Sequence, residues 1–233
     1  MSVVIKSCIF AVLQKMAKQR ILNFYINRRC SFEHIKSGSV NTFIHNNRVV
    51  RSVMNRYDRD IMLACRYVRS DMKKYLAYNE MPDILPSATT FYRHSDYRRY
   101  INTEVDAIDI NACYWNILYN KGILSEKVYK RFVDQKKARL IAVGNLFKKT
   151  IIKKYIEGVL IDTKILDNDF AIGWQFVVSE SWKILLECRE VTNDNVLMFK
   201  TDCFFVLPEY TKCVCDLIEA KGLSWKIEKK VLK

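Results

Sequence analysis

The sequence predicts an α+β protein in which an antiparallel sheet carries helices and follows a helical N-terminal region. Three observations lead to this prediction. Apolar residues recur at helical spacing in the first third of the chain, short alternating segments appear after residue 104, and 233 residues are enough to bury a large core. Half of the residues are apolar, with only six Gly and three Pro, which excludes disordered and collagen-like proteins.

The N-terminal region, residues 1–85, is expected to be helical. Residues 2–22 are typical of an amphipathic helix laid on a core. A long helix is predicted over residues 59–78, where apolar residues recur every three to four positions. Pro82 and Pro86 interrupt this pattern, so a domain boundary is expected near residues 80–90.

The second domain, residues 86–233, is expected to contain the sheet. It begins with a strand over 105–110 and a helix over 112–119. A basic helical segment follows at 121–157, with many Lys and Arg and few carboxylates. Residues 170–178 fit either a strand or the start of a helix, and 179–188 fit a helix.

The last part of the chain has the pattern of a hairpin, a helix and a strand. Two apolar segments, 196–199 and 203–207, flank Lys200-Thr-Asp202 as strands flank a turn. A helix is predicted over 209–220 and stopped by Gly222, and residues 223–228 then alternate like a strand with one polar face.

The charge balance indicates a polyanionic partner. The chain carries 39 Lys and Arg against 25 Asp and Glu, a formal net charge of +14. Nucleic acid and anionic membranes are the usual partners of such a chain. Its early apolar run, 8–13, is far too short to span a bilayer and lacks a secretory cleavage pattern, so we expect an intracellular protein with no membrane partner.

The cysteines agree with an intracellular location and do not indicate a metal site. Eight are present without a CxxC pair, and most lie within apolar stretches, as reduced buried cysteines do. His34, His45 and His94 are scattered, so structural zinc is not expected.

Two carboxylates stand out by their positions. Asp109 lies where a predicted strand passes into a helix, and Asp202 lies at the tip of an otherwise apolar hairpin. If these strands are neighbours, the carboxylates converge and can hold Mg²⁺ (or Mn²⁺), which prefers hard oxygen ligands and can assist phosphoryl transfer. Each residue alone also fits a structural role, because Asp is common at helix N-caps and in turns.

Together, these segments resemble the motifs of family-B DNA polymerases over roughly residues 103–231. Asp109-Ile-Asn-Ala-Cys-Tyr114-Trp115 resembles the first palm motif, and Lys200-Thr-Asp202-Cys-Phe-Phe resembles the later one. Between them, residues 135–147 are similar to the fingers helix. Trp225-Lys-Ile-Glu228-Lys229 resembles the strand that carries a Glu-Lys pair.

The resemblance implies a polymerase-like palm with short helical fingers at 121–157. It implies a minimal nucleotidyltransferase that extends a 3′ end by Mg²⁺-dependent phosphoryl transfer from dNTPs, with a DNA primer-template or single strand as partner. The implied metal ligands are Asp109 and Asp202, with Glu228 as a third candidate. The implied nucleotide-binding residues are Tyr114, under the sugar, and Lys136, Lys137 and Arg139, which neutralise the triphosphate.

A second group of residues is assigned to nucleic-acid binding. In residues 91–100 aromatic and cationic side chains interleave, a pattern that suits stacking on bases and pairing with phosphates. An ordinary surface strand with half-buried Tyr fits the same pattern. The assigned residues are Tyr92, Arg93, Tyr97, Arg98 and Arg99, to which the resemblance adds Lys229.

Several departures from the family pattern leave alternatives open. Trp115 replaces a Pro, Lys200 replaces the first Asp of the later motif, and 143–145 differ from the expected Asn-Ser. The chain ends soon after Glu228, so we expect a palm-and-fingers unit without a thumb, as in a divergent phage or mobile-element protein acting in a bacterial cytoplasm.

Two other readings remain. One is a catalytically silent, palm-derived nucleic-acid-binding protein of phage or mobile-element replication, for which a replication protein is a candidate partner. The other is a basic helical interaction protein whose motif matches are chance.

Overall fold

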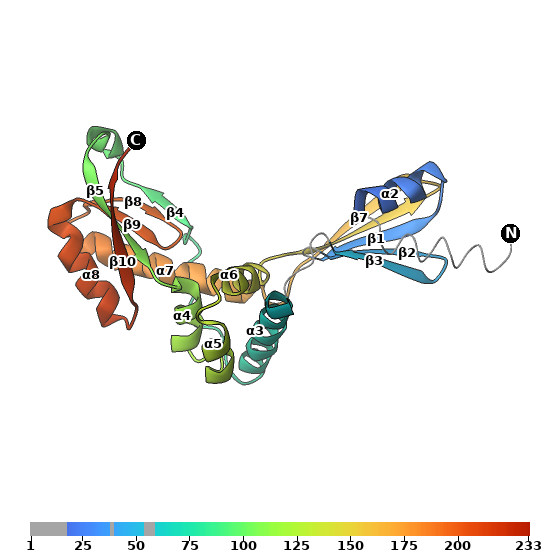
Figure 1. Ribbon diagram of the computed structural model, residues 1–233, viewed down its shortest axis with the longest axis horizontal. Helices are drawn as coiled ribbons and strands as arrows, with labels where there is room; N and C mark the ends of the chain where they lie inside the picture. The colour runs from blue at the N-terminus through green and yellow to red at the C-terminus, as the bar shows by residue number, and fades with distance from the viewer. Residues whose placement is uncertain (1–17, 38–39, 54–58) are drawn as a thin grey trace.

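The computed structural model describes residues 18–37, 40–53 and 59–233, which form an α+β protein with two antiparallel sheets. Figure 1 shows an elongated molecule, with one sheet at each end and helices between them. We call the sheet of order β3-β2-β1-β6-β7 sheet A and the sheet of order β10-β5-β9-β8-β4 sheet B. The predicted α+β class is therefore confirmed.

Sheet B is a split βαβ unit with an added edge strand. Its strands are β4 (Phe91–Arg93), β5 (Glu104–Ile110), β8 (Val196–Lys200), β9 (Cys203–Val206) and β10 (Trp225–Val231). The path β5-α7-β8-β9-α8-β10 places the strands in the spatial order fourth, first, third, second. This order puts β5, the first strand of the unit, beside β9.

Two helices cover one face of sheet B. They are α7 (Ala171–Val191) and α8 (Thr211–Ala220), whose buried apolar side chains join those of Ile108 and Phe204 in the main core. The opposite face, which we call the open face, is covered at one end by the short 3-10 helix η1 (Tyr97–Tyr100), packed over Val105.

The helices in the middle of the molecule share the core of sheet B. They are α3 (Arg59–Tyr78), α4 (Cys113–Asn120), α5 (Glu126–Phe132) and α6 (Lys136–Gly144). Met72, Trp115 and Phe132 are buried in one cluster with the inner faces of α7 and α8. The carboxylate of Asp71 accepts hydrogen bonds from the backbone N–H (2.9 Å) and hydroxyl (2.7 Å) of Ser125, which ties α3 to the start of α5.

Sheet A is assembled from two distant parts of the chain. Its strands are β1 (Phe32–Ser37), β2 (Val40–His45), β3 (Arg48–Val53), β6 (Thr150–Ile156) and β7 (Val159–Leu166). The helix α2 (Lys18–Asn27) covers one face, burying Ile21 and Tyr25 in a small core of their own. At the junction of the two parts, the rings of Phe32 and Tyr155 stack with centroids 4.4 Å apart.

Several predicted elements are confirmed. A helix occupies residues 59–78 as predicted, and the strand, hairpin, C-terminal helix and last strand appear as β5, β8–β9, α8 and β10. The ambiguous segment 170–178 is the first part of α7, which continues without a break to Val191. Most of the amphipathic helix expected over 2–22 lies outside the described residues.

Two predictions of helix are wrong. Residues 32–37, 40–45 and 48–53, expected to be helical with the rest of 1–85, form β1, β2 and β3, and the end of the basic segment 121–157 forms β6. β1 and β6 gain a pairing partner far away in sequence, and β2 and β3 pair beside β1 as successive hairpins, so strand pairing overrides the helical pattern. The Pro-rich stretch at 82–86 does not separate two cores, because α3 before it and the helices after it pack in one cluster.

Two further features of the described residues are the hydrophobicity of the helices and the state of the cysteines. Across the residues that the structure describes, no helix is both long and apolar enough to cross a lipid bilayer. The seven cysteines in these ranges are free thiols.

Gly158 lies in the turn between β6 and β7, where the backbone passes close to the end of α2, and substitution of this glycine tests how much that close approach contributes to stability. It has φ +79°, and a Cβ there would lie 2.6 Å from the backbone oxygen of Ile26. We expect Gly158→Ala to lower the free energy of unfolding by about 2 kcal/mol or more, since left-handed backbone strain of about 1 kcal/mol adds to the clash. Chemical denaturation measures this loss.

Gly122→Ala is the matched control for Gly158→Ala. Gly122 has a similar φ of +70° but open space around its Cβ position, so only the backbone strain is expected. Equal losses in the two variants would show that the approach of Ile26 to the turn does not matter.

Candidate functional site

The structure brings Asp109 and Asp202 together. Asp109 is on β5 and pairs in register with Cys203, the residue after Asp202. The backbone N–H of Ile110 donates to the carbonyl oxygen of Asp202 at 2.9 Å, and the N–H of Thr201 donates to Thr90 O at 2.7 Å. The hairpin turn is thus held on one side to the end of β5 and on the other side to the residue before β4.

Burial and mutual repulsion perturb this pair. Burial, and after it the nearby negative charge of Asp109, raise the pKa of Asp202 to about 6, against the opposing effect of Lys136 and Lys226. Desolvation and a like charge both disfavour a carboxylate. A carboxylate with its pKa raised in this way gains from a bound cation, and such groups are concentrated at functional sites.

A row of side chains crosses the open face at the level of Asp109. The register joins Phe91 on β4, Lys200 on β8, Cys203 on β9 and Asp109 on β5 to Lys226 on β10. Since directly paired residues point to the same face of an antiparallel sheet, these five side chains share the open face. Asp109 therefore lies on an accessible surface.

Lys226 neutralises Asp109. Its Nζ lies 3.3 Å from Asp109 Oδ2 and 3.7 Å from Glu228 Oε1, so it sits between the two carboxylates. Glu228 also pairs with Lys230 at 3.1 Å. The ion pair with Asp109 raises the pKa of Lys226, which stays protonated.

The two carboxylates, Asp109 and Asp202, fit a metal ion whose other ligands are phosphate oxygens and water. In the described ranges, no group of three or more His, Cys, Asp or Glu is arranged to hold a metal ion. Asp109 and Asp202 supply two hard oxygen donors, and Mg²⁺ in phosphoryl-transfer sites usually takes one or two carboxylates plus phosphate oxygens and water. Glu228, the third candidate ligand, is held off by Lys226.

A small pocket of about 160 Å³ adjoins Asp202. Tyr114 on α4 and Trp174 on α7 line it, with their rings edge to face and centroids 5.4 Å apart. The Tyr114 hydroxyl donates to Thr201 O at 3.4 Å, and burial raises its pKa, so the phenol stays protonated. The pocket therefore has an aromatic wall fixed to the turn that carries Asp202.

Arg139 forms the cationic side of the same pocket. It projects from α6, and its Nε is buried without a hydrogen-bond partner. Burial lowers the pKa of Arg139, but a guanidinium remains charged at any physiological pH. A half-buried charged group with an unpaired donor is suited to an anionic ligand such as phosphate.

The predicted lysines differ in how close they lie to Asp109 and Asp202. Lys136 on α6 is close enough to act electrostatically on Asp202, whereas Lys137 is simply an exposed side chain of that helix. Lys229 points to the face of sheet B opposite Asp109, where it pairs with Glu104 at 2.8 Å. The structure thus does not bring Lys229 to the site.

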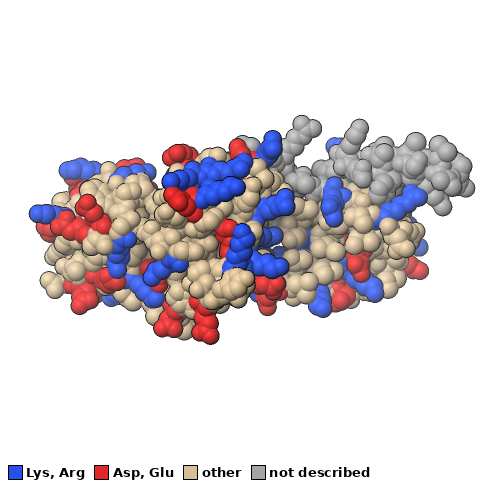
Figure 2. Space-filling view, turned by 90° about the horizontal axis from the view of Figure 1, so that it is seen from below, with Lys and Arg blue, Asp and Glu red and all other residues tan. Residues whose placement is uncertain are grey.

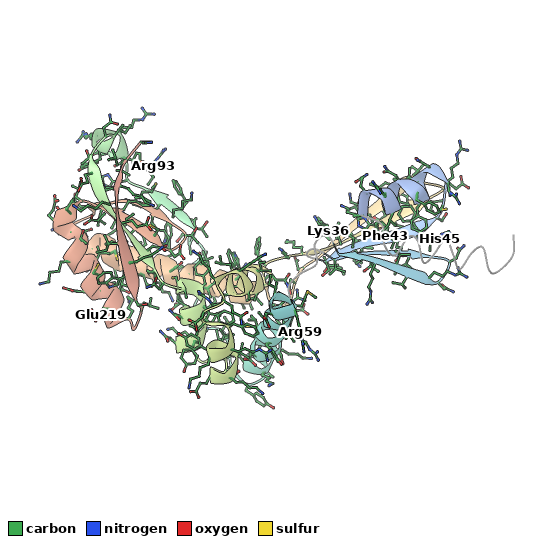
Figure 3. The ribbon with its side chains drawn as sticks, viewed as in Figure 1. Lys36, Phe43, His45, Arg59, Arg93 and Glu219 are labelled. Carbon is green, nitrogen blue, oxygen red and sulfur yellow. The ribbon has the colours of Figure 1, made fainter. Side chains whose placement is uncertain are left out.

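The nucleic-acid-binding residues predicted in segment 91–100 form two groups: aromatic rings that already contact an arginine, and exposed arginines. Tyr92 is half-buried beneath the guanidinium of Arg189 (4.6 Å from the ring centroid), and Tyr97 lies under Arg93 (5.6 Å). These two rings already have partners. Arg93, Arg98 and Arg99 are exposed, with Arg99 paired to Asp96 at 3.3 Å, and Arg93 projects from β4 (Figure 3).

Phe91, Lys226 and Trp174 are site residues that sequence reasoning missed. Phe91 is 50% exposed in the row that contains Asp109, and it is better placed to stack on a base than either Tyr. The alternation of residues 225–231 could have placed Lys226 on the face of Glu228. Trp174 gave no signal, because its segment fitted either a strand or the start of a helix and the face it presents was therefore undetermined.

No protein-family model matches the chain, and no curated protein or solved structure is significantly similar to it. The interpretation of the site therefore depends on its geometry and on the resemblance of its motifs.

The raised pKa of Asp202 predicts that this residue destabilises the folded protein. Its folded pKa of about 6 exceeds the unfolded value of 3.8, so ionisation costs stability above pH 6 and nothing below pH 3.8. We expect Asp202→Asn to raise the free energy of unfolding at pH 7.5 by roughly 2 kcal/mol, with the gain disappearing near pH 4. Thermal denaturation across this pH range measures it.

Asp216→Asn on the exposed side of α8 is the control, and we expect little change at either pH. An Asp202→Asn protein that is no more stable than wild type at pH 7.5 would show that the carboxylate is not held in an unfavourable environment.

Proposed function

We propose that this chain is a Mg²⁺-dependent nucleotidyltransferase with a polymerase-like palm, which extends a 3′ end from dNTPs. One observation carries the proposal. Asp109 on β5 and Asp202 in the β8–β9 turn lie together at one end of sheet B, next to a pocket that contains an aromatic wall and a half-buried guanidinium. The same residues carry the resemblance to the palm and fingers motifs of family-B DNA polymerases.

The arrangement of elements is compatible with these roles. Sheet B is antiparallel with helices on one face, which is compatible with a palm, and α6 lines the pocket beside its acidic end, which supports the proposed role of α6 as short fingers. Fold alone does not determine function, so the proposal depends on the site residues.

Each residue has a distinct task in the proposed reaction. Asp109 and Asp202 would hold Mg²⁺, which when bound would neutralise charge on the reacting phosphate oxygens. Arg139 and Lys136 would bind the triphosphate and stabilise charge that develops on the leaving pyrophosphate. Tyr114 would support the sugar, and Lys226 would have to release Asp109 when the metal binds.

A silent nucleic-acid-binding protein is the alternative favoured by a specific observation. Lys226 already pairs with Asp109, and its ammonium neutralises the site without any metal. If this ion pair is permanent, the pocket could bind nucleotide or strand without catalysis. The two functions differ in whether nucleotide is incorporated.

Primer extension tests the proposed function directly. We expect purified wild-type protein to add dNTPs to a DNA primer-template in Mg²⁺ and not in EDTA. Asp109→Asn and Asp202→Asn should each lower the rate by at least about 1,000-fold, because roughly 4 kcal/mol of transition-state stabilisation is lost with a metal ligand. Gel analysis of single-nucleotide addition measures the rate.

The control is Asp216→Asn, which removes one exposed carboxylate from α8 and should leave extension unchanged. Tight binding of the primer-template without any incorporation, in either Mg²⁺ or Mn²⁺, would reject the enzyme and support the silent binding protein.

Tyr114 predicts discrimination against ribonucleotides. Because its ring is fixed against Trp174 beside Asp202, removing it should open space for a 2′-hydroxyl. We expect Tyr114→Ala to lower the preference for dNTPs over rNTPs by about 10-fold or more in kcat/KM, a typical size for a steric contact in a pocket. Tyr114→Phe, which loses only the hydroxyl, should retain the preference; if Ala and Phe behave alike, the ring is not a steric gate.

A further inference from the structure

A second, larger groove lies between sheet A and the helices. It has a volume of about 520 Å³ and is walled by the ends of β1–β3 on one side and by α3 and α6 on the other. Figure 2 shows Lys and Arg side chains gathered about the hollow in the middle of the molecule. The cations that line the groove are Arg51, Arg66, Arg69 and Lys148.

The charge in this groove is of one sign. No Asp or Glu is among the described residues that line it. Arg51, Arg66 and Lys148 are exposed, and Arg69 is half-buried, with Nη2 donating weakly to Asn145 O at 3.5 Å and a buried Nε without a partner. Four cations facing a recess without carboxylates leave a positive potential that a polyanion would neutralise.

The groove and the pocket beside Asp202 share α6 as a wall. Ile141 and Asn145 face the groove, whereas Arg139 and Val143 face the pocket. A chain lying in the groove would therefore pass one helix thickness from the proposed catalytic residues.

We propose that this groove binds the sugar-phosphate backbone of a nucleic-acid strand that leads to the Asp109–Asp202 site. The proposal deepens the proposed function and rests on it for the direction of the strand. The four cations would pair with successive phosphates, and Ile61 and Ile141 give the groove an apolar floor against which sugars can pack.

The shape and charge favour a strand over other polyanions. The positive surface continues past the groove, because Arg59 at the start of α3 (Figure 3) lies one helical turn before Met62, which lines the groove. A single nucleotide would occupy only part of this length. A membrane surface is nearly flat and could not reach cations on the two walls of a recess.

The test uses single-stranded DNA and three exposed cations. Binding of a fluorescein-labelled 20-mer of deoxythymidine is followed by anisotropy over a salt titration, with wild type and with the Arg51→Ala/Arg66→Ala/Lys148→Ala protein. Each phosphate contact in a single strand contributes about 0.7 to the slope of log K against log salt. Losing three contacts should reduce the slope by about 2 and the affinity at 0.1 M salt by roughly 100-fold.

A matched control removes the same charge elsewhere. Arg20→Ala/Lys73→Ala/Lys212→Ala neutralises three exposed cations on α2, α3 and α8, none of which lines the groove. We expect this protein to bind like wild type. Equal losses in the two triple variants would overturn the proposal, because net charge alone would then account for binding. So would a groove variant that binds DNA normally but loses binding to phosphatidylserine vesicles.

The outcome can be separated from that of the proposed function. If no protein incorporates nucleotide while the groove variant still loses strand binding, the groove is supported and the enzyme is not. If wild type extends primers and the groove variant binds and extends equally well, the enzyme is supported and the groove is not.

Discussion

The pairing of β5 with β9 is the interaction on which the rest of the site depends. It places Asp109 next to the residue that follows Asp202, and the hydrogen bond from Ile110 to the turn fixes the hairpin at that position. Two carboxylates in this proximity repel each other and lose solvation. The apolar layer beneath them, which includes Ile108 and Phe204 against α7 and α8, provides the burial free energy that offsets this cost.

Cations around the acidic pair determine what it can bind. Lys226 contacts Asp109 directly, and Lys136 acts on Asp202 from α6, so the site is nearly neutral without a ligand. A Mg²⁺–triphosphate complex would bring both charges needed to replace these contacts, the metal for the carboxylates and the phosphates for the lysines and Arg139.

Local patterns predicted the elements with strong hydrophobic periodicity and missed the strands of sheet A. The helix at 59–78 and the hairpin around Asp202 have strong periodicity and could be read directly. Sheet A could not, because Phe32 meets Tyr155 only in three dimensions and β7 is exposed throughout, without an alternation to recognise. In the site, consecutive residues of a strand face opposite ways, so Glu228 and Lys229 could never both reach Asp109.

The two-part origin of sheet A has a consequence for how the protein is made. β1 is synthesised more than 100 residues before β6, since Phe32 pairs with Tyr155. During translation the edge of β1 that will pair with β6 therefore keeps its backbone groups unpaired while α3 to α6 are synthesised. Such an edge is a site for wrong pairing with other nascent chains. Once the β6–β7 hairpin has been synthesised, β6 pairs with β1 and covers this exposed edge.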